Sequence, residues 1–185
     1  MALVTSHHDL ISQARAGDRH AFAQLLRQVD GRMRSLASGL VREWSEVDDV
    51  LQDSYLRAYR SMTTFRGEAA FSTWLHTIVY RTCVEHLAQR RLRRQIDLRM
   101  QAEPVAKDDQ ASRHAEADAI EQALRMLPPA QAAVVILIDG DGCTYDEVAQ
   151  IVGAPEGTIA SRLNRGRRAL RAELGDENIE VVRDV

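Results

Sequence analysis

The run from Val47 to Tyr59 constrains the fold most strongly, because its apolar residues recur at steps of three and four. This spacing places side chains on one face of an α-helix. The opposite face carries acidic and amide side chains: Asp48, Asp49, Gln52 and Asp53. We expect Ser45 to cap this helix, whose early carboxylates complement the helix dipole. The polar face is either solvated surface or a docking site for a basic protein.

A second amphipathic run, from Leu75 to Arg94, has the opposite charge. Its apolar stripe is Leu75, Ile78, Val79, Cys83 and Leu87. Its polar side includes Arg81 and ends in four arginines within five residues: Arg90, Arg91, Arg93 and Arg94. Arginines near a helix C-terminus can complement the dipole. Four exceed that need, and they suit a phosphate backbone.

Three aromatic residues, Phe65, Phe71 and Trp74, lie between or just inside these two runs. Such residues are commonly part of a core. Beside a basic helix they are also candidates for stacking unpaired bases of single-stranded nucleic acid. The sequence leaves both interpretations open.

The segment DDVLQDSYLRAYRSMTTFRGEAAFSTWLHTIVYRTCVEHLAQRR resembles the second conserved region of bacterial sigma factors, especially the extracytoplasmic-function group. The resemblance rests on the order of an acidic helix, an F-R-G-E-A-x-F-x-T-W-L loop and a basic helix. It implies contact with the clamp helices of the polymerase β′ subunit through Asp48, Asp49, Gln52, Asp53, Leu56 and Arg60. It also implies contact with the minus-ten promoter element through Phe65, Arg66, Phe71, Ser72, Trp74, Thr77, Arg81, Arg90, Arg91 and Arg94.

The later part of the chain predicts a helix-turn-helix. AQAAVVILID is short and apolar like a strand, but its alanines and its neighbours favour a buried helix. Thr144 and Glu147 form a capping box, Gly153 ends that helix, and Pro155 suits the start of the next. Inward spacing of Ile159, Leu163 and Leu170 leaves a basic outer face, typical of a recognition helix. A basic helical hairpin without DNA binding is the alternative.

CTYDEVAQIVGAPEGTIASRLNRGRRALRAEL also resembles the fourth conserved region of the same sigma group. The resemblance implies contact with the minus-thirty-five element through Thr158, Ser161, Arg162, Arg165, Arg167, Arg168 and Arg171. Ala160 stands where the family often has a basic residue, so one contact is expected to be missing. The preceding DGDG turn is more acidic than usual and has no assigned role. It lacks the glycine and final glutamate of a calcium loop.

The sequence therefore predicts an all-α protein of two small helical domains joined by a flexible linker. We expect a first domain at 1–94, a polar linker at 95–114, a second domain at 115–175 and an acidic tail at 176–185. The net charge of −3 argues against an indiscriminate DNA binder, but charge is segregated: residues 156–171 hold five arginines and one acid.

Several function classes find no support in the sequence. It has no Walker loop, dinucleotide fingerprint or metal-ligand spacing, so we expect no enzyme activity, cofactor or metal. Cys83 and Cys143 occupy apolar positions and indicate buried thiols. No apolar run could insert into a membrane and no secretory signal is recognised, so a cytoplasmic location is expected.

The resemblance implies a transcription initiation factor whose partners are core RNA polymerase (β′ clamp helices and β flap), promoter DNA and an anti-sigma factor. A conventional helix-turn-helix regulator that binds an operator alone is the alternative. A regulator of that kind would not explain the acidic helix, the F-R-G-E loop or the arginine cluster at 90–94.

Overall fold

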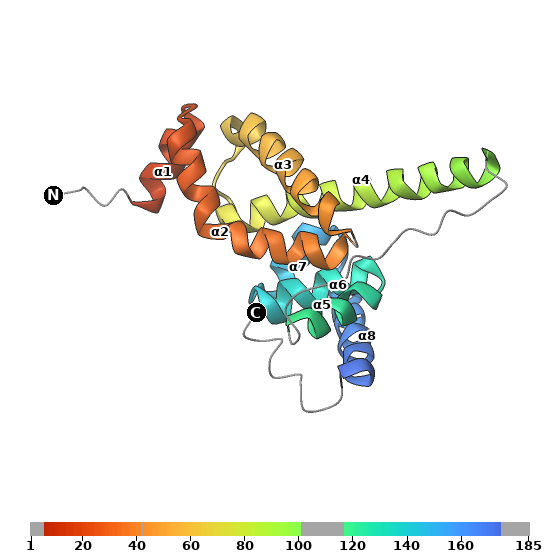
Figure 1. Ribbon diagram of the computed structural model, residues 1–185. Coiled ribbons are helices and arrows are strands. Elements are labelled where there is room, and N and C mark those ends of the chain that lie inside the picture. Colours follow the sequence, from red (N-terminus) through yellow and green to blue (C-terminus); the bar gives the residue numbers. More distant parts are fainter. Residues whose placement is uncertain (1–5, 42, 101–116, 175–185) are drawn as a thin grey trace.

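The computed structural model describes residues 6–41, 43–100 and 117–174, and these ranges contain helices and no strands (Figure 1). The all-α prediction is confirmed. Most of the predicted linker and the whole acidic tail lie outside the described residues. The elements are α1 (His7–Arg15), α2 (Arg19–Leu40), α3 (Trp44–Ser61), the short 3-10 turn η1 (Met62–Thr64), α4 (Phe71–Met100), α5 (Ala117–Met126), α6 (Pro129–Val135), the π-helical turn η2 (Ile136–Gly140), α7 (Tyr145–Val152) and α8 (Glu156–Leu174).

The N-terminal half, α1–α4, packs around the long helix α2. Asp18 caps α2, because its carboxylate accepts hydrogen bonds from the backbone N–H groups of His20 and Ala21. The core side chains from α2 are fully buried with those of α4: Leu25, Met33, Leu36, Phe71, Leu75 and Val79. Helix α1, which the sequence analysis did not anticipate, starts with a capping box between Ser6 and Asp9.

Two helix boundaries differ from the expectation. Helix α3 begins at Trp44, so Ser45 lies inside the first turn and the predicted Ser45 cap is wrong. The capping position belongs to Glu43, which makes no side-chain cap hydrogen bond and instead pairs with Arg90 of α4. Helix α4 continues through Arg94 to Met100, into the segment expected to be linker. Its distal half projects from the body of the protein (Figure 1).

The C-terminal half, α5–α8, contains the predicted helix-turn-helix. The Thr144–Glu147 capping box starts α7, and Gly153 ends it with φ of +69°, a left-handed conformation that glycine adopts without a Cβ penalty. AQAAVVILID is helical as predicted, forming α6 and the π-helical turn η2. Ile159, Leu163 and Leu170 of α8 are buried.

The two halves pack against each other, which the sequence analysis did not predict. Helices α5 and α6 lie against the C-terminal end of α2, and α7 lies against the start of α4 (Figure 1). Consequently Ser38, Gly39 and Leu40 are all buried, although three consecutive positions of a helix point in three directions. A Cβ on Gly39 would lie 2.3 Å from Ile136 Cδ1, so the backbones approach closely here. The halves therefore share a continuous apolar core.

Within the described ranges, every helix is either too short or too polar to cross a lipid bilayer.

Gly166 sets the packing of α8 on α6, so we predict that Gly166→Ala destabilises the protein. The new Cβ would lie 2.7 Å from Val135 Cγ2, and a β-branched side chain cannot easily turn away. Overpacking outweighs the better helix propensity of alanine, for a net loss of about 1–2 kcal/mol in urea denaturation. Gly157→Ala in the same helix is the control, because a Cβ there meets nothing within 4 Å. Equal midpoints for both variants would contradict the packing argument.

Candidate nucleic-acid interface

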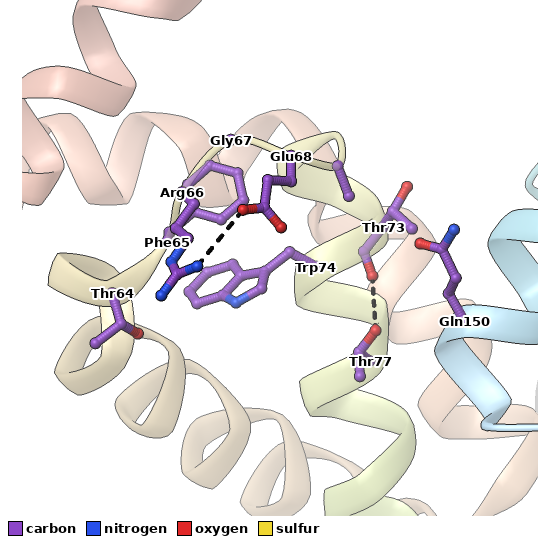
Figure 2. Close-up of a pocket in the computed structure, with 10 residues that line it drawn as sticks. Thr64, Phe65, Arg66, Gly67, Glu68, Thr73, Trp74, Thr77 and Gln150 are labelled. Atoms are coloured by element: carbon purple, nitrogen blue, oxygen red, sulfur yellow. Dashed lines mark hydrogen bonds and ion pairs between the residues drawn. The ribbon is translucent and has the colours of Figure 1, made fainter.

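A surface pocket of about 250 Å³ lies where the loop after η1 meets the first turns of α4 (Figure 2). Its lining residues are Thr64, Phe65, Arg66, Gly67, Glu68, Ala69, Thr73, Trp74, Thr77 and Gln150. Gly67 has φ of +76°, so the loop turns sharply at a residue that tolerates this conformation. Arg66 and Glu68, on either side of it, pair at 3.7 Å across the pocket mouth. The pocket thus joins an apolar wall to an exposed guanidinium.

The aromatic residues form a cluster beneath and beside this pocket. Phe65 and Trp74 have ring centroids 5.0 Å apart, and Phe71 lies 5.7 Å from Trp74. Phe65 and Phe71 are buried at 4% and 2% exposure, whereas Trp74 is half-buried. Trp74 therefore presents an aromatic surface to the pocket, while Phe71 supports it from the core.

The other predicted minus-ten residues lie along α4. Ser72 is half-buried in its first turn, Thr77 lines the pocket and donates a hydrogen bond to the Thr73 carbonyl, and Arg81 is exposed one turn further on. Arg91 and Arg94 are exposed on the projecting half of α4 and form no ion pair with a described residue. Exposed cations therefore occur on the same helix both near the pocket, at Arg81, and further along, at Arg91 and Arg94.

Arg90 differs from its neighbours in the arginine cluster. It pairs with Glu43 and, at 3.4 Å, with Glu46, both in the first turn of α3 or just before it. Glu46 also accepts from His86 at 2.9 Å. The ion pairs of Arg90 thus hold α3 against α4. The sequence alone could not reveal this pairing.

The acidic face of α3 is exposed but partly neutralised. Asp48 pairs with Arg34 of α2 at 2.7 Å, and this hydrogen bond raises the pKa of the arginine. Asp53 lies 2.9 Å from Arg57, which also reaches Glu85 of α4. By contrast, no ion pair joins Asp49 to any residue in the described ranges.

The rest of this face combines polar and apolar exposure. Gln52 and Arg60 are exposed, and Leu56 is 48% exposed between them. An exposed leucine rimmed by charged side chains is the composition of a protein-docking surface. The predicted polymerase-binding residues therefore share one accessible face of α3.

The predicted contact residues of helix α8 fall into three groups. Thr158, Ser161, Arg162 and Arg165 share one face, where Arg165 donates to the Ser161 carbonyl and hydroxyl. Arg168 and Arg171 are exposed further along the helix. Arg167 points elsewhere, because its Nε donates to Asp139 at 2.9 Å and holds α8 against η2.

Residues that the sequence analysis did not select join the two halves. His76 Nε2 lies 2.9 Å from Asp141 Oδ2, and Thr73 Oγ1 lies 3.1 Å from Glu147 Oε1. Asp141 belongs to the DGDG turn that had no assigned role. No sequence signal identifies these pairs, since their members are at least 65 positions apart. No group of three or more metal-ligating side chains occurs in the described part of the chain.

Comparison with known families matches residues 23–93 to sigma-70 region 2 and residues 117–170 to sigma-70 region 4. The extracytoplasmic-function sigma factor SigM of Mycobacterium tuberculosis is 36% identical, over 95% of this chain and 88% of its own. The sigma-H factor of Pseudomonas aeruginosa is 31% identical, over 91% of this chain and 94% of its own.

A solved structure is also similar along nearly the whole of its length. The sigma factor RpoE of Bartonella quintana, crystallised with the anti-sigma factor NepR, matches with a TM-score of 0.71 and 28% identity. The match covers 84% of this chain and 97% of that one. These relatives are sigma factors throughout, and a stand-alone regulator is not favoured. The two matched regions and the full-length relatives together show that this chain belongs to the extracytoplasmic-function family of RNA polymerase sigma factors.

Proposed function

We propose that this sigma factor works through three separate surfaces, one that binds core polymerase and two that read promoter DNA, and that the pocket beside Trp74 is the central one. The observation that carries this proposal is the pocket's construction. An aromatic wall and the exposed Arg66 line the pocket, and helix α4, which supplies Trp74, also carries Arg81, Arg91 and Arg94, which are exposed and form no ion pair with a described residue. Single-stranded nucleic acid is bound by this combination of stacking surface and cationic path.

The pocket is proposed to hold an unstacked base of the minus-ten element. Trp74 stacks on the base, Arg66 and Thr77 provide polar contacts, and Phe65 with Phe71 keeps the indole in place. Arg81, Arg91 and Arg94 follow the phosphate backbone. Capturing the flipped base offsets part of the unpairing cost, a few kcal/mol per base.

The exposed face of α3 is proposed to bind the clamp helices of the polymerase β′ subunit. Asp49 is its most available charge, because the carboxylates of Asp48 and Asp53 are already paired. Leu56 offers apolar area at the centre of the same face. In this proposal the charge of Asp49 speeds association with the clamp helices, and burial of Leu56 stabilises the complex.

Helix α8 is proposed to enter the major groove at the minus-thirty-five element. The face of Thr158, Ser161, Arg162 and Arg165 is the candidate for base edges, and Arg168 and Arg171 are candidates for phosphates. Arg167 donates to Asp139, so it is not among the phosphate contacts proposed here.

An anti-sigma factor is the proposed regulatory partner, as it is for RpoE of Bartonella quintana. The protein itself is proposed to have no catalytic activity and to work in the cytoplasm with core polymerase. Both statements are inferred from the family.

Run-off transcription with purified core polymerase tests the proposal as a whole. Specific transcripts should appear only when the protein is added, while a gel shift of the protein alone should show weak binding. Tight operator binding without any polymerase-dependent transcript would instead establish the conventional regulator.

We predict that Trp74→Ala lowers promoter opening about tenfold to a hundredfold, because stacking on one base contributes about 1–3 kcal/mol. Permanganate reactivity of the unpaired minus-ten thymines measures this step. Val84→Ala is the control, since this exposed apolar residue of the same helix lies outside the pocket. Equal promoter opening by both variants would remove the pocket from the minus-ten site.

Reversing the charge of Asp49, by Asp49→Arg, should weaken binding to core polymerase about tenfold in the absence of DNA. The expected cause is lost electrostatic attraction, seen mainly as a slower association rate that depends on salt. Glu68→Arg makes the same charge change at an exposed loop position of the same half and should leave core binding unchanged. A normal association rate for Asp49→Arg would identify the α3 acids as solvated surface.

Substitutions in α8 should separate base contacts from phosphate contacts. Arg162→Ala is expected to relax sequence preference, with discrimination reduced by about 1–3 kcal/mol. Arg171→Ala should weaken binding to all sequences similarly. Transcription from a panel of minus-thirty-five variants measures both, and identical profiles for the two variants would contradict this division.

A further inference from the structure

The DGDG turn uses its two carboxylates in different ways. Asp139 pairs with Arg167 inside the C-terminal half, whereas Asp141 crosses to His76 in the N-terminal half. The His76 and Asp141 side chains are 1% and 3% exposed, so this pair lies in the sealed part of the contact. The sequence offered no role for this turn, and the structure places it between the halves.

Because both side chains are buried, the His76–Asp141 contact favours the arrangement in which the two residues face each other. A carboxylate removed from water is costly unless it is paired and hydrogen-bonded, so Asp141 is accommodated here only while His76 faces it. His76 Nδ1 has no partner among the described residues. A carboxylate oxygen accepts, so Nε2 is the ring nitrogen that donates to Asp141. Separating the halves returns both groups to water.

A second polar contact lies one helical turn away. Thr73 donates to Glu147, whose pKa is lowered chiefly by the backbone N–H of Thr144 at 2.8 Å, so the carboxylate stays ionised. Gln150, on the same helix α7, forms part of the wall of the Trp74 pocket (Figure 2). Helix α7 thus covers one side of the proposed minus-ten site.

The opposite edge of the contact is closed by other residues. The Arg125 guanidinium lies 4.3 Å from the ring centroid of Trp44, and Ile136 fits against Gly39. A cation over an aromatic face and a close apolar approach both stabilise the contact. The halves are therefore held at two edges, with apolar packing between them.

This arrangement is incompatible with reading both promoter elements at once. Elements named minus-ten and minus-thirty-five lie about 25 base pairs apart, or about 85 Å at roughly 3.4 Å per base pair. In the structure, residues from α4 and α7 line a single pocket, so the minus-ten surface and the helix-turn-helix are in direct contact. The halves must separate before the promoter can be engaged.

We propose that the structure is a closed, promoter-incompetent state, and that Asp141 of the DGDG turn latches it through His76. Core polymerase then selects the open state by binding the two halves apart, at the cost of the latch. The consequence for transcription rests on the proposed promoter-reading function, whereas the latch itself rests on geometry alone. The two are tested separately.

A reversible disulfide between the halves tests closure. Gly39→Cys and Ile136→Cys place two thiols at a close approach of the halves, since a Cβ at Gly39 would lie 3.6 Å from Ile136 Cγ1. Cys143→Ala removes the half-buried native thiol. Cys83 can stay, because burial raises the pKa of its thiol to about 12.

Transcription by the oxidised and reduced forms of this variant gives the first readout. We expect the oxidised form to be at least tenfold less active with core polymerase, and dithiothreitol to restore activity. Recovery of activity on reduction would also show that the variant is folded. Equal activity of both forms would overturn the promoter-incompetent state. Silence of both forms would refute the proposed function, and the latch is then judged by the next measurement.

Thiol labelling measures the latch without transcription. With Ile136→Cys and Cys143→Ala as background, the rate of alkylation of the new buried thiol reports how often the halves open. Adding Asp141→Ala should raise that rate about tenfold, because His76 loses its buried partner. Asp146→Ala is the matched control, since Asp146 accepts a hydrogen bond only from Gln150 of its own helix.

Labelling of Cys83 in the same samples reports global unfolding. Faster labelling at position 136 alone, and only with Asp141→Ala, supports the latch. Equal rates for the Asp141 and Asp146 variants would overturn it, as would parallel labelling of Cys83.

Discussion

The burial of α4 against α2 is the contact on which the rest of this protein depends. Leu75, Val79 and Cys83 are fully buried, and they hold α4 in one rotation about its axis. Because side chains on a helix keep fixed angular positions, this rotation decides where every other residue of α4 points. It directs Trp74 into the pocket, His76 toward the C-terminal half and Arg81 into solvent.

The distribution of ion pairs then decides which charges remain available. Arg90 and Arg167 each pair with acidic residues of this chain, and Asp48 and Asp53 pair with Arg34 and Arg57. Asp49, by contrast, forms no ion pair with any described residue, and neither do Arg91 and Arg94 on the projecting part of α4. A small net charge is therefore compatible with local binding of both nucleic acid and protein.

The contact between the halves gives regulation a physical basis. Its polar pairs are side chains that a folded half would otherwise expose to water, so closing and opening exchange similar interactions. Such a balance allows a binding partner to shift the population between the closed and open states, even when its affinities for the two states differ only moderately. An anti-sigma factor and core polymerase could thus act on the same equilibrium in opposite directions.

The sequence by itself determined the all-α class, the cap at Thr144, the turn at Gly153 and the family. These features depend on local spacing and backbone chemistry, which the sequence states directly. It misplaced the start of α3, since Glu43 is engaged by Arg90 from a distant helix. Only the tertiary structure decided that Phe71 is core, that Arg167 belongs to Asp139 and that Asp141 meets His76. Each of these pairs residues far apart along the chain, and such pairing depends on how helices pack, which periodicity within one helix does not specify.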